Sequence, residues 1–202
     1  MWLRLGLASA GVVGAVLARA LLADPWPWLA FNLGLAWVPV ALGAIASRGK
    51  RALVLAGPLW LLFLPNAPYL LTDLVHLRSR PPVPLWFDVA LLGGAGALGL
   101  ALGALSLRQM ADCVRRVLGP WGSFCLWAGC PPLCGVAIYL GRVSRWNSWD
   151  VFRDPTGPLS EVLGLIAAPG ANRAAWAFIL TWTLLFGAAA SLGYRDPRAA
   201  SC

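Results

Sequence analysis

Six apolar runs, each close to the length of a membrane-spanning helix, constrain this chain more than any other feature. A helix needs about 20 residues to cross the roughly 30 Å hydrocarbon core of a bilayer. Charged residues make up only 12% of the sequence, whereas about a quarter of a soluble domain is charged. The sequence therefore predicts an all-α, polytopic transmembrane helix bundle. The expected spans cover residues 5–22, 26–46, 52–74, 85–107, 121–140 and 174–192.

The whole chain, 1–202, is expected to form a single integral membrane domain. Ala18-Arg19-Ala20 resembles a signal-peptidase site, so cleavage of the first run is an alternative. Apolar residues continue beyond that site, and the next span follows directly after a turn at Asp24-Pro25. This continuity favours an uncleaved first helix.

The third span is interrupted by two prolines, Pro65 and Pro68. They remove N–H donors that would have met the carbonyls of Leu61 and Leu64. A freed carbonyl at membrane depth needs a partner from protein or water, and Asn66 is well placed to supply one. Beyond the break, four polar residues are spaced i, i+3, i+4, i+7, which predicts one face of an α-helix. They are Tyr69, Thr72, Asp73 and His76, the single histidine of the chain.

A second polar stretch, residues 141–155, follows the fifth span. Arginine forks suit phosphate or carboxylate, so Arg142 and Arg145 are candidates for binding a lipid phosphate or polyprenyl-phosphate headgroup. The alternative is structural. Asn147 or Ser148 would cap a short helix with Asp150 in its first turn, and an arginine would neutralise Asp73 or Asp150.

Other segments carry simpler expectations. Gly99 and Gly103 stand in a GxxxG spacing typical of close helix packing. Residues 108–118 predict a basic interfacial linker, Pro131-Pro132 a kink in the fifth span, and residues 159–168 a short interfacial helix. Asn32 is expected to hydrogen-bond a neighbouring helix near Pro65.

Charge distribution predicts the orientation. When the loops are assigned alternately, nine Lys and Arg residues lie with the N-terminus and seven on the other side. Positive charge concentrates on the cytoplasmic side, so both termini are expected inside. Six of the eight acids fall at the outer ends, which places the 64–77 and 141–155 stretches on one side. That shared side follows from the parity of the spans and holds even if the whole topology is inverted.

These motifs resemble a known family. Leu64-Pro65-Asn66-Ala67-Pro68-Tyr69, Thr72-Asp73-Leu74, His76-Leu77 and Arg145-Trp146-Asn147-Ser148-Trp149-Asp150 are similar to the bacterial membrane family called domain of unknown function 1361. The segment 32–39 resembles its second span as well, and the likeness covers about residues 30–190. It implies a multi-pass protein of the bacterial inner (plasma) membrane. It implies no reaction.

The candidate site is a polar pocket at the outer face. Asp73 and His76 are the candidate catalytic residues, as an oriented acid–base pair. They are also weighed as metal ligands with Asp88 or Asp150, and as a polar helix face that meets water or headgroups. No metal or cofactor is predicted. The expected cluster is Asn66, Tyr69, Asp73, His76, Asp88, Arg142, Arg145, Asn147 and Asp150.

Function is narrowed mainly by exclusion. The sequence has no Walker loop, GxSxG, HExxH or paired-cysteine zinc pattern. The +8 net charge suits membrane lipids better than nucleic acid, because the arginines lie between apolar runs. Cys130 and Cys134 are expected to be buried thiols. The leading hypothesis is an enzyme or binder of a lipid or envelope-precursor headgroup. The alternatives are a non-enzymatic assembly subunit that packs on a protein partner, and a small-solute transporter.

Overall fold

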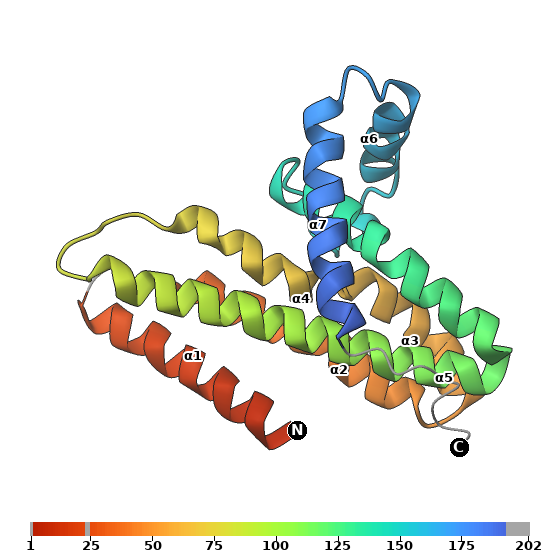
Figure 1. Cartoon of the computed structure of the whole chain (residues 1–202), viewed down its shortest axis with the longest axis horizontal. Coiled ribbons are helices and arrows are strands. Elements are labelled where there is room, and N and C mark those ends of the chain that lie inside the picture. The colour runs from red at the N-terminus through yellow and green to blue at the C-terminus, as the bar shows by residue number, and fades with distance from the viewer. Residues whose placement is uncertain (1, 23–24, 193–202) are drawn as a thin grey trace.

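The computed structural model describes residues 2–22 and 25–192, and the fold over these residues is all-α (Figure 1). The expected turn residue Asp24 and the polar tail 194–202 lie outside the described residues. Five helical segments are long and apolar enough to cross a membrane. The helices are α1 (Trp2–Leu22), α2 (Pro27–Ala46), α3 (Lys50–Phe63), α4 (Asn66–Tyr69), η1 (Leu70–His76), α5 (Leu85–Arg142), η2 (Asp150–Phe152), α6 (Thr156–Ala167) and α7 (Arg173–Ser191).

The first layer of the bundle is formed by α1, α2 and the first half of α5, which run side by side (Figure 1). Its core is made of small and aliphatic residues such as Leu33, Ala36, Leu92 and Ala95. Helix α1 packs on this layer only lightly, since most of its side chains are exposed. Trp37 Nε1 donates a hydrogen bond of 3.0 Å to Ser9 Oγ and ties α2 to α1.

The long helix α5 consists of two helices joined at Gly119, where φ is +76°. Glycine adopts positive φ without the steric cost of a Cβ, and Pro120 begins the second helix, where its missing N–H is tolerated. Figure 1 shows the chain turning back at this point. Residues 108–118, the expected linker, are helical and lead into this turn. The backbone stays helical at Pro131 and Pro132, where a kink was expected, and the non-helical φ/ψ within α5 lies at Gly119.

The third segment is continuous from α3 through α4 to η1 but changes its helix type. The polar stripe was expected on an α-helix, yet residues 70–76 form a 3₁₀-helix. A 3₁₀-type bond also stands at the proline break, where Pro68 has no N–H to give and Ala67 N donates to Leu64 O at 3.2 Å. The carbonyl of Phe63 accepts from Asn66 Nδ2 at 3.0 Å. Asn66 thus binds a backbone carbonyl at the break, although it is that of Phe63 and not that of Leu61 or Leu64.

Glycines on α5 allow α4 and α7 to approach closely. A Cβ at Gly99 would overlap the carbonyl oxygen of Ala67, and one at Gly103 would lie 2.9 Å from Phe186 Cε2. In the second half of α5, a Cβ at Gly135 would collide with Ile179 O and Thr183. The GxxxG pair therefore permits close helix packing, as expected. Helix α7 packs against both halves of α5.

The short helix α6 lies beside the N-terminal part of α7 (Figure 1). Trp176 Nε1 on α7 donates to the carbonyl of Leu165 on α6 at 3.2 Å. The helix confirms the segment expected at 159–168. Leu159, Leu163 and Ile166 give it an apolar face that is more than half exposed. An exposed apolar face on a short helix is typical of a segment lying in a membrane interface.

Candidate functional site

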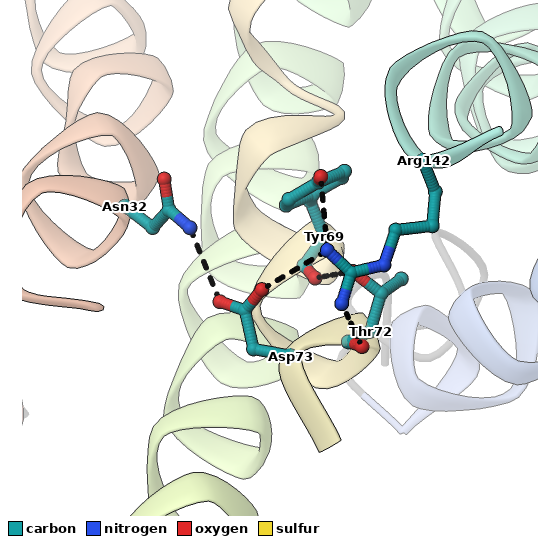
Figure 2. A network of polar contacts seen from close by, with 5 residues as sticks. All are labelled: Asn32, Tyr69, Thr72, Asp73 and Arg142. Atoms are coloured by element: carbon teal, nitrogen blue, oxygen red, sulfur yellow. Dashed lines mark hydrogen bonds and ion pairs between the residues drawn. The ribbon is translucent and has the colours of Figure 1, made fainter. Parts of the chain in front are cut away.

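Asp73 is the centre of a buried polar network at the end of the third segment (Figure 2). Its side chain is 1% exposed. Asn32 Nδ2 on α2 donates to Asp73 Oδ2 at 3.1 Å, and Arg142 Nη1 on α5 lies 3.6 Å from Asp73 Oδ1. The two side chains approach the carboxylate from opposite sides. A buried carboxylate needs such partners, because an unpaired charge in a low-dielectric interior is costly.

Arg142 also binds the backbone and the ring of the same segment. Its Nη2 donates to the Thr72 carbonyl at 2.7 Å, and its Nη1 points to the Tyr69 hydroxyl at 3.4 Å. The guanidinium lies 5.6 Å from the centre of the Tyr69 ring. The fork is thus held by three oxygen partners on one segment, which fixes the C-terminal end of α5 against η1.

Residues 143–155, which connect α5 to α6, lie beside this network and are called the wall below. Trp146 Nε1 donates to Glu161 Oε2 on α6 at 3.0 Å, and Ser144 Oγ donates to the other oxygen of Glu161. Asn66 Nδ2 donates to Ser148 Oγ at 3.0 Å, which joins the wall to α4. These contacts give a connecting segment fixed partners on two sides.

Two aspartates hold turns within this wall. Asp150 Oδ2 accepts from the backbone N–H of Asn147 at 2.7 Å and from its side chain at 3.1 Å. Asp154 Oδ1 accepts from the hydroxyl and N–H of Thr156 and from the N–H of Gly157 at the start of α6. The Thr156 hydroxyl and the Gly157 N–H hold the pKa of Asp154 below its ordinary value. Both carboxylates therefore stabilise turns of the wall.

The network and the wall border an open cavity of about 330 Å³. This is near the lower end of the range for small-molecule pockets. Leu35, Leu62 and Ala137 contribute apolar lining, and the indole and phenyl rings of the site lie around the same space. The aromatic lining residues are Trp28, Phe31, Tyr69, Trp146 and Trp149, and the polar ones are Asn32, Asn66, Asp73, His76, Arg142, Asn147 and Ser148.

Six of the nine residues expected at the site line this one cavity. They are Asn66, Tyr69, Asp73, His76, Arg142 and Asn147. Asp150 stands behind Asn147 as its hydrogen-bond partner. Arg145 is exposed and adopts a positive φ of 64° in the turn. Neither Arg145 nor Asp150 belongs to the cavity lining.

Asp88 lies apart from the cavity and pairs with Arg19. The Nε of Arg19 is 2.8 Å from Asp88 Oδ1, and both side chains are fully buried. The Arg19 guanidinium also stacks 3.6 Å from the centre of the Trp26 ring. This pair joins the end of α1 to the start of α5, so Asp88 has a packing partner rather than a place in the site.

Asp73 and His76 are not arranged as an acid–base pair. His76 is exposed and its ring packs against Trp28, with 4.7 Å between ring centres. Within the part of the chain that the structure describes, no hydrogen bond or ion pair joins His76 to Asp73. Among those same residues, no group of three or more His, Cys, Asp or Glu side chains is placed to hold a metal ion.

Several lining residues were not singled out as site residues from the sequence. Asn32 was expected to bond a neighbouring helix but not to reach Asp73. Trp28, Phe31 and Trp149 come from the N-terminal end of α2 and from the wall. No local motif indicates these residues. The sequence indicates them only through the expected alternation of helix directions, which places their segments on the same side as Asp73 and Arg142.

The arrangement defines a class of protein: an α-helical protein with several membrane-length helices and a polar, aromatic-lined cavity at one end. The model of the family described as "Protein of unknown function (DUF1361)" matches residues 31–188. The chain belongs to this family, as its motifs predicted, and the match covers every lining residue of the cavity except Trp28. No curated protein and no solved structure matches the chain significantly.

Proposed function

We propose that the protein is a six-span bacterial inner-membrane protein whose cavity binds the headgroup of a lipid or envelope precursor at the outer face. The observation that carries the proposal is the cavity itself, about 330 Å³ beside the Asp73–Arg142 pair. Counting the two halves of α5 separately gives six apolar helices. The cavity is then built from the start of the second span and the ends of the third and fifth, which share one membrane side.

The composition of the lining supports binding in preference to transport. Polar side chains gather around Asp73, whereas Leu35, Leu62 and Ala137 are apolar and come from the membrane-length parts of α2, α3 and α5. A transporter needs a polar path that continues toward the other side. Apolar lining beside a polar cluster suits an amphiphilic ligand, whose headgroup meets the polar residues and whose tail remains in the bilayer.

The remaining space beside the paired residues favours binding over the assembly-subunit alternative. That hypothesis predicts that polar residues pair internally and leave no space. Pairing is indeed extensive, as Asp73, Arg142 and Asn66 show. A cavity of ligand size remains beside these pairs, and this supports a binding role for it.

The test is to fill the cavity. Ala137→Phe places a phenyl ring among the cavity residues, and Ala10→Phe adds the same ring on an exposed face of α1 as a matched control. Protein extracted with its native lipids would be analysed by native mass spectrometry. We expect an amphiphile that co-purifies with the wild type and with Ala10→Phe to be lost, at least tenfold, from Ala137→Phe. Equal retention by a folded Ala137→Phe variant would contradict the proposal.

A further inference from the structure

The three asparagines of the cavity have fixed orientations, and this determines what they offer a ligand. Asn32 Nδ2 faces the Asp73 carboxylate, Asn147 Nδ2 faces the Asp150 carboxylate, and Asn66 Nδ2 faces the Phe63 carbonyl. These partners can only accept hydrogen bonds, so each must meet the amide nitrogen. Each side-chain oxygen is therefore turned away from that partner, as Figure 2 shows for Asn32.

No described residue donates a hydrogen bond to any of these three amide oxygens. Two hydroxyl groups among the lining residues accept a hydrogen bond but donate none within the described residues. Tyr69 Oη accepts from Arg142, and Ser148 Oγ accepts from Asn66, while neither hydroxyl proton goes to an acceptor among the described residues. Residues that line the cavity thus hold three neutral acceptors and two rotatable donors without a partner among the described residues.

The charge of the cavity is balanced within the protein. Arg142 is the one arginine or lysine among the described lining residues, and it faces the Asp73 carboxylate, the Thr72 carbonyl and the Tyr69 hydroxyl. A phosphate requires several donors and an excess of positive charge. Here it would lie beside Asp73 and compete for a guanidinium that already has three oxygen partners. The geometry therefore disfavours the phosphate ligand that the arginines alone suggest.

A sugar ring matches the remaining features. Each sugar hydroxyl both donates and accepts, which suits neutral amide oxygens and rotatable hydroxyls. The C–H faces of the ring are apolar, and the cavity offers Trp28, Phe31 and Trp149 among its aromatic walls. Phe31 and Trp149 pack edge to face with centres 6.3 Å apart, so α2 and the wall meet through rings.

We propose that the cavity recognises an uncharged sugar headgroup, through the amide oxygens of Asn32, Asn66 and Asn147 and the surrounding aromatic rings. This inference rests on the proposed headgroup-binding function and specifies its ligand. The shared chemistry is a pyranose with free hydroxyls, carried either by a glycolipid or by a soluble glycoside.

The experiment compares defined probes on the full chain in detergent micelles by native mass spectrometry. The probes are monoglucosyl diacylglycerol, phosphatidic acid and diacylglycerol with the same acyl chains, together with methyl glucoside. We expect the glucosyl lipid to be retained at least tenfold more than diacylglycerol or phosphatidic acid. Methyl glucoside competing as strongly as the glucosyl lipid would identify a soluble glycoside as the source of the sugar. Weak competition would identify a glycolipid.

Variants locate the binding. Asn147→Ala and Trp149→Ala should each weaken retention of the glucosyl lipid about three- to tenfold, the range expected for one hydrogen bond or one stacking ring. Asn172→Ala and Trp121→Ala are matched controls outside the cavity and should leave retention unchanged. Trp149→Phe keeps a ring and should retain most of the binding. Thermal melting of each variant identifies any that fails to fold.

The outcomes separate the two proposals. Phosphatidic acid retained as well as the glucosyl lipid, and lost in Asn147→Ala, would overturn the sugar inference while the headgroup site stands. A glucosyl lipid that binds equally to wild type, Asn147→Ala and Trp149→Ala would place its site elsewhere and overturn the sugar inference. Retention of no headgroup probe above diacylglycerol would overturn both proposals.

Discussion

Among the described residues, two arginine–aspartate pairs differ in their surroundings and therefore in their roles. Arg19 and Asp88 are 2.8 Å apart and fully buried between α1 and α5. Arg142 and Asp73 are 3.6 Å apart, and the arginine side chain keeps 19% of its surface exposed. The first pair therefore joins a lightly packed helix to α5, while the second pair lines the cavity.

The Arg19–Asp88 pair leads to a prediction about stability. Asp88→Asn removes the carboxylate charge that faces the buried guanidinium, so we expect a loss of about 3–5 kcal/mol, the range for breaking a buried pair. Thermal melting in detergent would show it as a lower midpoint. Asp112→Asn, on the exposed side of α5, is the control. The double variant Arg19→Met with Asp88→Leu should recover much of the loss, and an unchanged midpoint for Asp88→Asn alone would refute this role.

The sequence could predict the contacts of a residue with its sequence neighbours better than its contacts with distant parts of the chain. Two neighbouring prolines point to Asn66 as the partner of a freed carbonyl, and its amide nitrogen binds the carbonyl of Phe63. Arg19 and Asp88 are 69 positions apart. Parity placed both at the same end of the bundle, but their pairing depends on how α1 lies against α5. Asp88 was therefore assigned to the wrong group of side chains.

At the scale of helices, close packing depends on positions where a side chain would not fit. Gly99→Ala would place a Cβ against the carbonyl oxygen of Ala67, and the helices would have to separate. We expect a loss of about 1–3 kcal/mol, the usual cost of overpacking. Gly93→Ala in the same helix has open space around its Cβ and should be neutral or stabilising, because alanine favours helix by about 1 kcal/mol. Equal melting midpoints for the two variants would contradict this account of the packing.

Helix positions were predictable from hydrophobic length, whereas changes within a helix were not. The apolar runs located α1, α2, α3 and α7, because each needs only enough apolar residues to cross a bilayer. The 3₁₀ form of η1 and the positive φ at Gly119 were not predicted. Both are properties of particular backbone positions, which hydrophobicity does not report.

Across the whole molecule, the cavity lies where helices from distant parts of the chain meet. The start of α2 and the ends of the third segment and of α5 line it. The expected alternation of the helices places these ends on one side, so the sequence could predict that the two polar stretches meet. It could not predict the asparagine orientations, because they depend on contacts between α2, α4 and the wall.

Parity also makes the proposed orientation testable. In a background with Cys125 and Cys202 replaced by serine, Ser160→Cys places a thiol on α6 and Ser47→Cys places one in the turn after α2, both at exposed positions. A maleimide that cannot cross membranes should label Ser160→Cys in intact cells and Ser47→Cys only after lysis. The basic turn at residues 47–51 is the reason for this expectation, because positive charge is retained inside. The reverse pattern would move the cavity to the cytoplasmic face and refute an outer headgroup site. Labelling of both thiols in intact cells would refute the alternation of six spans, because the two ends of the bundle would then share one side.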